Sequence, residues 1–333
     1  MSLEQRAEQL DEARRLRIIK SDSIDVEKYL HSNDVTIKVK QARDFLDDIK
    51  ESYLSTARDT KIVLPWSKTH DSFAFRPGEV TVYAGSNGGG KSLLTGQIAL
   101  HLVKQGQKVC IASFEMKPVK TIERMLRQFS GEFIDDPLVS DREAYITKIL
   151  TRMDKFTVDH LYLYDQQGTT SPDKVIAMAR YCAVELGVQH IFIDSLMKCV
   201  KNEDDFNGQK CFIDELTALA RDHNVHIHLV HHIRKQASDE VTPNKNDLKG
   251  SGSISDQVDN VFLVWRNKKK ENQRNRGETV DESQGDTFLM NEKQRNGEAQ
   301  EWYQLWYHQA SQQFVESAGS RPQDFDNNGR FRD

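Results

Sequence analysis

One segment of the chain combines residue types that bind phosphate groups. Gly85-Ser86-Asn87-Gly88-Gly89-Gly90-Lys91-Ser92 has the pattern G-x-x-x-x-G-K-S and lies between the apolar run Val80–Ala84 and an apolar helical pattern at Lys91–Lys104. Glycines let backbone N–H groups converge on a β-phosphate, and a helix N-terminus favours anions. In this pattern Lys91 reaches the β- and γ-phosphates and Ser92 ligates Mg²⁺. A flexible glycine-rich turn is the alternative, and the complete motif between strand and helix argues against it.

A carboxylate that holds the Mg²⁺ shell is expected at the end of a buried strand near such a loop. Asp194 offers one, because it follows the apolar run His190–Ile193. The same pattern could make Asp194 an ordinary N-cap of a helix. The phosphate-binding loop elsewhere in the chain favours the metal-holding role.

Hydrolysis of a bound nucleoside triphosphate needs a group that orients or deprotonates water opposite the γ-phosphate. Glu115 is the leading candidate, because it ends the next apolar run, Val109–Phe114. The carboxyl ends of parallel strands meet at one crevice, which would bring Glu115 towards the loop. Glu203 and Asp204 are the alternative pair, and their polar surroundings favour a solvated role for them.

Histidines gather in and around one later strand, at His223, His226, His228, His231 and His232. A metal site is one interpretation. On a strand, however, His226 and His228 share one face and His231 points to the other. No carboxylate or thiolate at ligand spacing joins them. We therefore predict that the end of this strand carries a polar sensor, a neutral imidazole that could donate a hydrogen bond to the γ-phosphate.

The elements that position these residues alternate between strand and helix. Apolar runs of strand length occur at Val80–Ala84, Val109–Phe114, Leu161–Tyr164, His190–Ile193, Val225–Val230, Val261–Trp265, Phe288–Met290 and Trp302–Tyr307. Helical patterns lie between the earlier runs, at Lys91–Lys104, Val119–Phe129, Pro172–Leu186 and Gln209–His223. This alternation predicts an α/β fold with a mostly parallel sheet flanked by helices. The last strands follow one another without helices, which indicates an antiparallel edge.

Length and composition bound the organisation of the chain. Its 333 residues exceed the ~250–300 that one core usually holds, so we expect extensions or a second domain. Residues 1–60 are polar and charged, with one amphipathic stretch at Thr36–Leu54, and form an N-terminal arm or linker helix. Residues 61–316 form the main α/β domain. Residues 317–333 are rich in Gly, Asn, Asp and Arg, which predicts a mobile tail.

Composition also limits the class of protein. No apolar run approaches the ~18 residues of a membrane span, and the N-terminus lacks an apolar signal region. The four cysteines lie far apart without a C-x-x-C pair, which indicates reduced thiols and a cytoplasmic location. A net charge of −5 gives no basic excess. Binding to nucleic acid would therefore depend on local loops.

The phosphate loop, Glu115, Asp194 and the histidine strand, in this order, resemble the RecA-like motor domain of hexameric replicative helicases. This group comprises the DnaB family, its phage helicase-primase relatives and the mitochondrial helicase Twinkle, and the resemblance covers about residues 62–308. Ser113-Phe114-Glu115-Met116 is similar to the S-x-E-M element that carries the catalytic glutamate. Ile191-Phe192-Ile193-Asp194 is similar to the Walker B sequence. His232-Ile233-Arg234-Lys235 looks like the H-P-R-K of Twinkle, where other members have a polar Gln or His.

Further segments extend the resemblance towards DNA and the nucleotide base. Asp247-Leu248-Lys249-Gly250-Ser251-Gly252, followed by Asp259-Asn260-Val261, resembles the region of the second central DNA-binding loop. Lys235, Lys245 and Lys249, beside Gly250 and Gly252, could track a phosphate backbone. Arg266 has the position of a base-contacting arginine in the phage relatives.

The segment Lys293-Gln294-Arg295-Asn296-Gly297 is close to the K-Q-R-N-G of DnaB. In the family this Lys and Arg reach across a subunit interface to the neighbour's γ-phosphate. Lys293 and Arg295 are two apart on a predicted strand and would project from one face as a cationic clamp. A solvated edge strand is the alternative interpretation.

The resemblance implies a ring helicase that uses ATP or another NTP with Mg²⁺, translocates on single-stranded DNA and unwinds forked duplex. It implies a homo-oligomer, expected to be a hexamer, in a bacterial or phage-infected cell, with a primase, polymerase or loader as separate candidate partners. No primase or helical collar precedes the motor here, and residues 1–60 could act like the family's linker helix, which packs on the adjacent subunit. Two alternatives stay open. A RecA-like recombination ATPase would bind DNA without unwinding it, and a small-molecule P-loop kinase would be a monomer and leave Lys293 and Arg295 unexplained.

Overall fold

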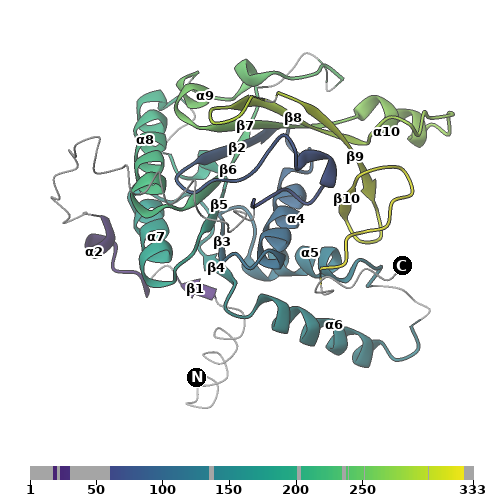
Figure 1. Cartoon of the computed structure of the whole chain (residues 1–333), viewed down its shortest axis with the longest axis horizontal. Helices are drawn as coiled ribbons and strands as arrows, with labels where there is room; N and C mark the ends of the chain where they lie inside the picture. The colour runs from purple at the N-terminus through teal and green to yellow at the C-terminus, as the bar shows by residue number, and fades with distance from the viewer. Residues whose placement is uncertain are drawn as a thin grey trace, which may run out of the picture.

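The computed structural model describes residues 18–20, 23–30, 61–134, 139–200, 204–234, 238, 240–250, 252–298 and 300–325. Within these ranges the strands form one sheet in the order β1-β4-β3-β5-β6-β2-β7-β8-β9-β10 (Figure 1). The strands are β1 Ile18–Lys20, β2 Val80–Gly85, β3 Val109–Ser113, β4 Leu161–Asp165, β5 His190–Asp194, β6 His226–His232, β7 Asn260–Arg266, β8 Thr287–Gln294, β9 Trp302–His308 and β10 Gln313–Val315. The strands from β1 to β7 in this order pair in parallel, and β8, β9 and β10 continue the sheet antiparallel. The predicted α/β fold with an antiparallel edge is confirmed.

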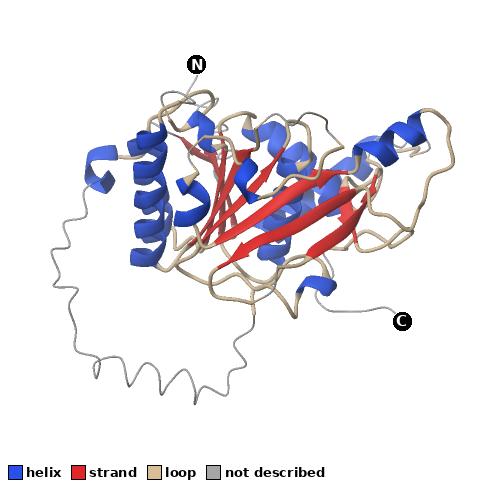
Figure 2. Ribbon diagram, turned by 90° about the horizontal axis from the view of Figure 1, so that it is seen from above, coloured by secondary structure: helices blue, strands red, loops and turns tan. Residues whose placement is uncertain are grey.

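Helices cover both faces of the parallel part (Figure 2). On one face α7 Pro172–Glu185 and α8 Phe206–His223 bury apolar side chains against β2, β5 and β6, with the short α9 Ser253–Gln257 beside α8. On the other face α4 Lys91–Lys104, α5 Pro118–Ser130 and α6 Arg142–Thr157 enclose a second apolar cluster. Alternation along β2 explains the two cores, since Val82 enters the first cluster and Tyr83 the second.

The structure adds elements that the sequence did not predict. These are the helices α2 Val26–Leu30, α6, α9 and α10 Lys268–Asn275, the short 3₁₀ turns η3 Ser67–Thr69, η4 Leu196–Lys198 and η5 Lys245–Asp247, and the strands β1 and β10. The largest, α6, begins after Asp141, whose side chain accepts a hydrogen bond from the Ala144 N–H. Only Ile149 and Met153 of α6 are buried. So narrow an apolar stripe explains why its pattern was missed.

Part of the N-terminal region packs on the main domain. The strand β1 pairs with β4, and the phenol ring of Tyr29 in α2 forms an edge contact with Tyr181 of α7, with ring centroids 5.4 Å apart. Arg180 donates hydrogen bonds to the carbonyl oxygens of Tyr29 and Leu30. The predicted helix at 36–54 lies outside the described residues.

The C-terminal segment also packs on the main domain. Phe325 is 1% exposed, and the Gln323 N–H donates to Gln313 Oε1 at 2.8 Å. The prediction of a mobile tail is therefore wrong for the segment that ends at Phe325, because a single aromatic side chain anchors it in the core. Residues 326–333 lie outside the described part. Of the described helices, none combines the length and apolarity that a membrane span requires.

Three buried histidines predict a specific dependence of stability on pH. The rings of His190, His226 and His228 lie together in the core beside Phe75 and Phe192. Burial lowers the pKa of His226 to about 4, and burial lowers the pKa of His190 and His228 well below the ordinary value. The unfolded chain therefore binds more protons as the pH falls through about 6.5, so this contribution to stability is complete above that pH and is lost below it.

Between pH 7.5 and 5.5 we expect the free energy of unfolding to fall by about 1.4 kcal/mol for each of these imidazoles. Urea unfolding at several pH values measures this slope. His226→Gln should reduce the slope by about one bound proton, whereas His160→Gln, at a partly exposed position, should leave it unchanged. Equal slopes for all three proteins would show that the cluster does not titrate as described.

Candidate nucleotide-binding site

The loop between β2 and α4 has the close packing that a phosphate cradle requires. A Cβ atom on Gly85 would lie 2.4 Å from the Val264 carbonyl oxygen of the neighbouring strand β7, so only glycine fits there. Gly90, the N-cap of α4, has a φ of 90°, which glycine adopts without strain. The loop therefore ends with the first N–H groups of a 14-residue helix facing the crevice.

Lys91 and Ser92 lie on the first turn of α4 and face the ends of β2 and β5. The Lys91 ammonium donates to the carbonyl oxygens of Gly85 at 3.0 Å and Ser86 at 2.8 Å. The Ser92 hydroxyl donates to Asp194 Oδ2 at 2.7 Å. A hydroxyl and a carboxylate at this separation are oxygen ligands of the kind that Mg²⁺ prefers.

Glu115 and His232 complete the same cluster from the ends of two other strands. Glu115 follows β3, and its Oε1 atom accepts a hydrogen bond from the Ser195 hydroxyl at 3.2 Å. The Nε2 atom of His232, the last residue of β6, lies 3.8 Å from Glu115 Oε1, and its Nδ1 atom lies 3.5 Å from Lys91 Nζ. His231 points away, and its Nε2 atom contacts the Lys249 carbonyl oxygen at 2.6 Å. The alternative Asp204 is exposed next to α8, and Glu203 lies outside the described residues.

These side chains line one pocket of about 560 Å³. Its wall includes Glu115, Asp194, His232 and the loop from Asn87 to Ser92. Arg124 of α5 and Gln312 of the turn between β9 and β10 also line it. Separate segments of sequence thus converge where the carboxyl ends of parallel strands meet.

Electrostatics in the pocket are set by burial. Burial lowers the pKa of Lys91, which the carboxylates of Asp194 and Glu115 oppose. Burial raises the pKa of Asp194, and the hydrogen bond from Ser92 opposes that shift. Burial, together with the nearby Lys91 cation, lowers the pKa of His232. His232 is therefore neutral near pH 7, which is the form in which the predicted sensor would act.

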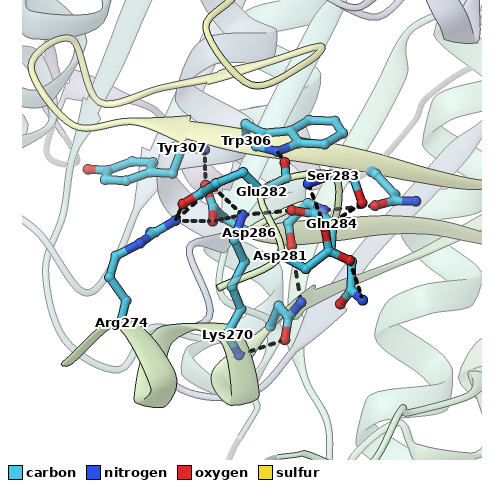
Figure 3. A network of polar contacts seen from close by, with 12 residues as sticks. Lys270, Arg274, Asp281, Glu282, Ser283, Gln284, Asp286, Trp306 and Tyr307 are labelled. Atoms are coloured by element: carbon cyan, nitrogen blue, oxygen red, sulfur yellow. Dashed lines mark hydrogen bonds and ion pairs between the residues drawn. The ribbon is translucent and has the colours of Figure 1, made fainter. Parts of the chain in front are cut away.

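A second, smaller pocket of about 170 Å³ adjoins the glycines of the loop. Arg266, Tyr307 and Phe314 line it, and Arg266 donates to Glu271 Oε1 at 2.8 Å. Its outer wall is a network of ion pairs between α10 and the loop before β8 (Figure 3). In this network the buried Lys270 ammonium lies 2.9 Å from Glu282 and 3.0 Å from Asp286.

The two cationic residues before the turn at Gly297 lie away from both pockets. Lys293 Nζ donates to the carbonyl oxygens of Ser255, Asp256 and Val258, and Arg295 lies 3.1 Å from Asp259 Oδ1. Both side chains thus contact one segment, as expected for a shared face, although Arg295 follows the end of β8. Asp259 Oδ2 in turn accepts from the N–H of Val80, the first residue of β2. Since β2 rises by ~3.3 Å per residue, the clamp and the phosphate loop are separated by about 17 Å.

The predicted DNA-contacting residues lie in the connection from β6 to β7. Lys245 is exposed in η5, and Lys249 is partly buried beside Gly250 and Gly252. Gly250 also has a packing role, because a Cβ atom there would lie 2.2 Å from Gln209 Oε1. Lys235 and Ser251 lie outside the described residues.

Sequence reasoning missed three residues of the site. Ser195, which holds Glu115, directly follows Asp194 and could have been suspected from that position. Arg124 lies about two turns into α5, where only the helical phase relative to Glu115 would indicate it. Gln312 has a φ of 56° in the turn before β10, and no local pattern in the sequence marks that turn as part of a pocket.

The fold and the site define a RecA-like P-loop nucleotide-binding domain, with a parallel sheet whose carboxyl edge carries the phosphate loop. The chain belongs to the family described as the DnaB-like helicase C-terminal domain, whose model matches residues 71–316. A probable plasmid replicative DNA helicase of Chlamydia psittaci is 25% identical over 199 residues, covering 57% of this chain and 43% of the relative. The Twinkle homolog protein, chloroplastic/mitochondrial, of Arabidopsis thaliana is 22% identical over 238 residues, covering 68% of this chain and 33% of the relative.

Solved structures show the same fold. An ATPase domain solved by itself superposes with a TM-score of 0.70 at 16% identity, covering 84% of this chain and 99% of that one. A DnaB-like replicative helicase, studied for its interactions with primase, superposes with a TM-score of 0.66 at 16% identity, covering 83% of this chain and 67% of that one. The expected membership of the DnaB-like helicases is confirmed. The chain spans less than half the length of the two curated relatives.

Proposed function

We propose that this chain is an NTP-driven DNA helicase motor that acts as a ring and moves on single-stranded DNA. One observation carries the proposal. Lys91, Glu115, Asp194 and His232 line a single phosphate-sized pocket, while Lys293 and Arg295 lie at the opposite end of the central strands. Such an arrangement suits a site that is completed by a neighbouring subunit, and membership of the DnaB-like family favours the helicase over a kinase.

The pocket residues suit hydrolysis of a nucleoside triphosphate. The loop and Lys91 would bind the β- and γ-phosphates, and Glu115, held by Ser195, would orient the attacking water and accept its proton. The neutral imidazole of His232 would donate a hydrogen bond to the γ-phosphate. Ser92 and Asp194 would hold Mg²⁺, which when bound neutralises charge on the phosphates. Arg266 and Tyr307 would flank the base in the smaller pocket.

Lys293 and Arg295 would serve the neighbour's nucleotide. The separation of about 17 Å along β2 prevents them from reaching the pocket of their own chain. An arginine supplied in trans stabilises the charge that develops on the departing phosphate. This geometry favours an interface between subunits at each nucleotide, as in a hexameric ring.

A forked-duplex assay tests the proposed function. We expect strand separation with Mg²⁺ and a hydrolysable NTP, and none with a non-hydrolysable analogue. Hydrolysis stimulated by single-stranded DNA without strand separation would instead support a RecA-like recombination ATPase. A monomer at all nucleotide concentrations, phosphorylating a small molecule, would support the kinase. Primase, polymerase or loader partners would be sought by adding them to the same assay.

Lys249→Ala should weaken binding of single-stranded DNA uniformly across sequences. The physical reason is that an interaction with the phosphate backbone releases counterions and reads no base. Fluorescence anisotropy at several salt concentrations should show a salt slope lower by about one for each phosphate that the variant no longer neutralises. Lys148→Ala, at an exposed position on α6, is the matched control and should bind DNA like the parent. Weakening restricted to some sequences would contradict the backbone role.

A further inference from the structure

A third pocket, of about 510 Å³, lies directly beside the phosphate end of the nucleotide pocket. The two pockets share four residues of their walls, namely Glu115, Met116, Arg124 and Gln312. The remaining wall comes from residues 117–127, at the start of α5. The shared residues place the junction between the two pockets at Glu115, where the attacking water would lie.

The third pocket is rich in cations. Its wall carries Lys117, Lys120, Arg124 and Arg127, against the carboxylates of Glu115 and Glu123. Lys120 Nζ lies 2.6 Å from Glu123 Oε2, so that acid is already paired with one of the four cations. When Glu115 takes the proton of the attacking water it becomes neutral, and the cations then outnumber the remaining carboxylate. The pocket is thus most favourable for an anion immediately after the cleavage step.

Gln312 stands at the junction with an unused polar atom. Its Oε1 atom is buried and accepts no hydrogen bond from the described residues. Its backbone carbonyl oxygen accepts from Gln128 Nε2 of α5 at 3.0 Å, which fixes the turn against the helix that forms the pocket wall. A carboxamide held in this way could accept from a protonated phosphate oxygen or, with the amide turned, donate to an ionised one.

We propose that this pocket is a binding site for inorganic phosphate, and that it receives the phosphate product as it leaves the nucleotide site. The inference rests on the proposed NTP hydrolysis. In that reaction the water oxygen bonds to the γ-phosphorus, the bond from phosphorus to the β,γ-bridging oxygen breaks, and a water proton passes to Glu115. In-line attack carries the phosphorus away from the nucleoside diphosphate and towards the water side. That side is the junction with the third pocket, so the product moves towards the cations.

Product inhibition tests the proposal with the full chain. The probe is inorganic phosphate, added at constant ionic strength during steady-state NTP hydrolysis. For Lys117→Gln/Lys120→Gln we expect the phosphate concentration that halves turnover to rise about tenfold, since two cations near a divalent anion are removed. The KM for the NTP should not change, because neither lysine lines the nucleotide pocket. Lys148→Gln/Lys155→Gln on α6 removes two exposed lysines elsewhere and should behave like the parent.

Three results would overturn the proposal. The first is equal phosphate inhibition of the Lys117/Lys120 variant and its control, and the second is a parent enzyme that phosphate does not inhibit. The third is a loss of single-stranded DNA affinity in the variant with unchanged phosphate inhibition, which would assign the pocket to a DNA backbone. If the parent hydrolyses no NTP, the proposed function fails together with this inference. If it does hydrolyse NTP and the variant matches its control, only this inference fails.

Discussion

Lys91→Ala and Glu115→Gln should both abolish most NTP hydrolysis, but only the first should also weaken nucleotide binding strongly. Lys91 supplies the cation that contacts the β- and γ-phosphates, so its removal takes away ground-state and transition-state interactions together. Glu115 acts on water, and its amide replacement leaves the loop, Lys91 and Ser92 unchanged. We expect turnover to fall by roughly 10²–10⁴-fold in Glu115→Gln, the range of general-base catalysis.

Titration with a fluorescent nucleotide and a steady-state phosphate assay measure the two effects separately. Glu123→Gln is the matched control, because this glutamate lines the adjacent third pocket but not the nucleotide pocket. It should retain both binding and turnover. If Glu115→Gln binds nucleotide as poorly as Lys91→Ala, then Glu115 has a structural role and the assignment of the general base is wrong.

The phosphate site was predictable from sequence because local rules fix it. A glycine-rich loop between an apolar strand and a helix has few alternative structures, and the acids at the ends of parallel strands must converge on it. Glu115, Asp194 and His232 accordingly lie at the ends of β3, β5 and β6 around the loop. The regular helix α4 was predicted with its observed bounds, Lys91–Lys104, because apolar periodicity and a glycine N-cap agree.

Other parts depend on contacts between distant segments that no local pattern shows. Gln312 joins the pocket only because β10 pairs with β9 and the turn packs on α5. Phe325 is buried against the far end of α4 and α6, although its neighbours in sequence are polar. The strand β8 continues through the polar residues Asn291–Gln294 because β7 supplies the backbone partners. In these cases tertiary pairing overrides the local preference of the sequence.

Arg295→Ala should bind nucleotide almost normally yet hydrolyse it about 10³–10⁵-fold more slowly, the effect of removing an arginine finger. Its charge is needed when the γ-phosphate departs and is remote from the pocket of its own chain. Arg295 also lies 3.1 Å from the buried Asp259, so the variant leaves a carboxylate with less compensation. Thermal unfolding of the variant and of Arg295→Lys should accompany the assay, since Arg295→Lys keeps the charge near Asp259 and isolates the catalytic effect.

The most direct test of the proposed ring is to mix Arg295→Ala protein with Lys91→Ala protein and measure NTP hydrolysis. Size measurement must first show that the two variants exchange subunits. If Arg295 acts in trans, some mixed interfaces pair an intact phosphate loop on one chain with an intact arginine on its neighbour. We predict that hydrolysis rises clearly above the level of either variant alone. Hydrolysis that stays at the level of the separate variants, after exchange is verified, would contradict an active site shared between subunits.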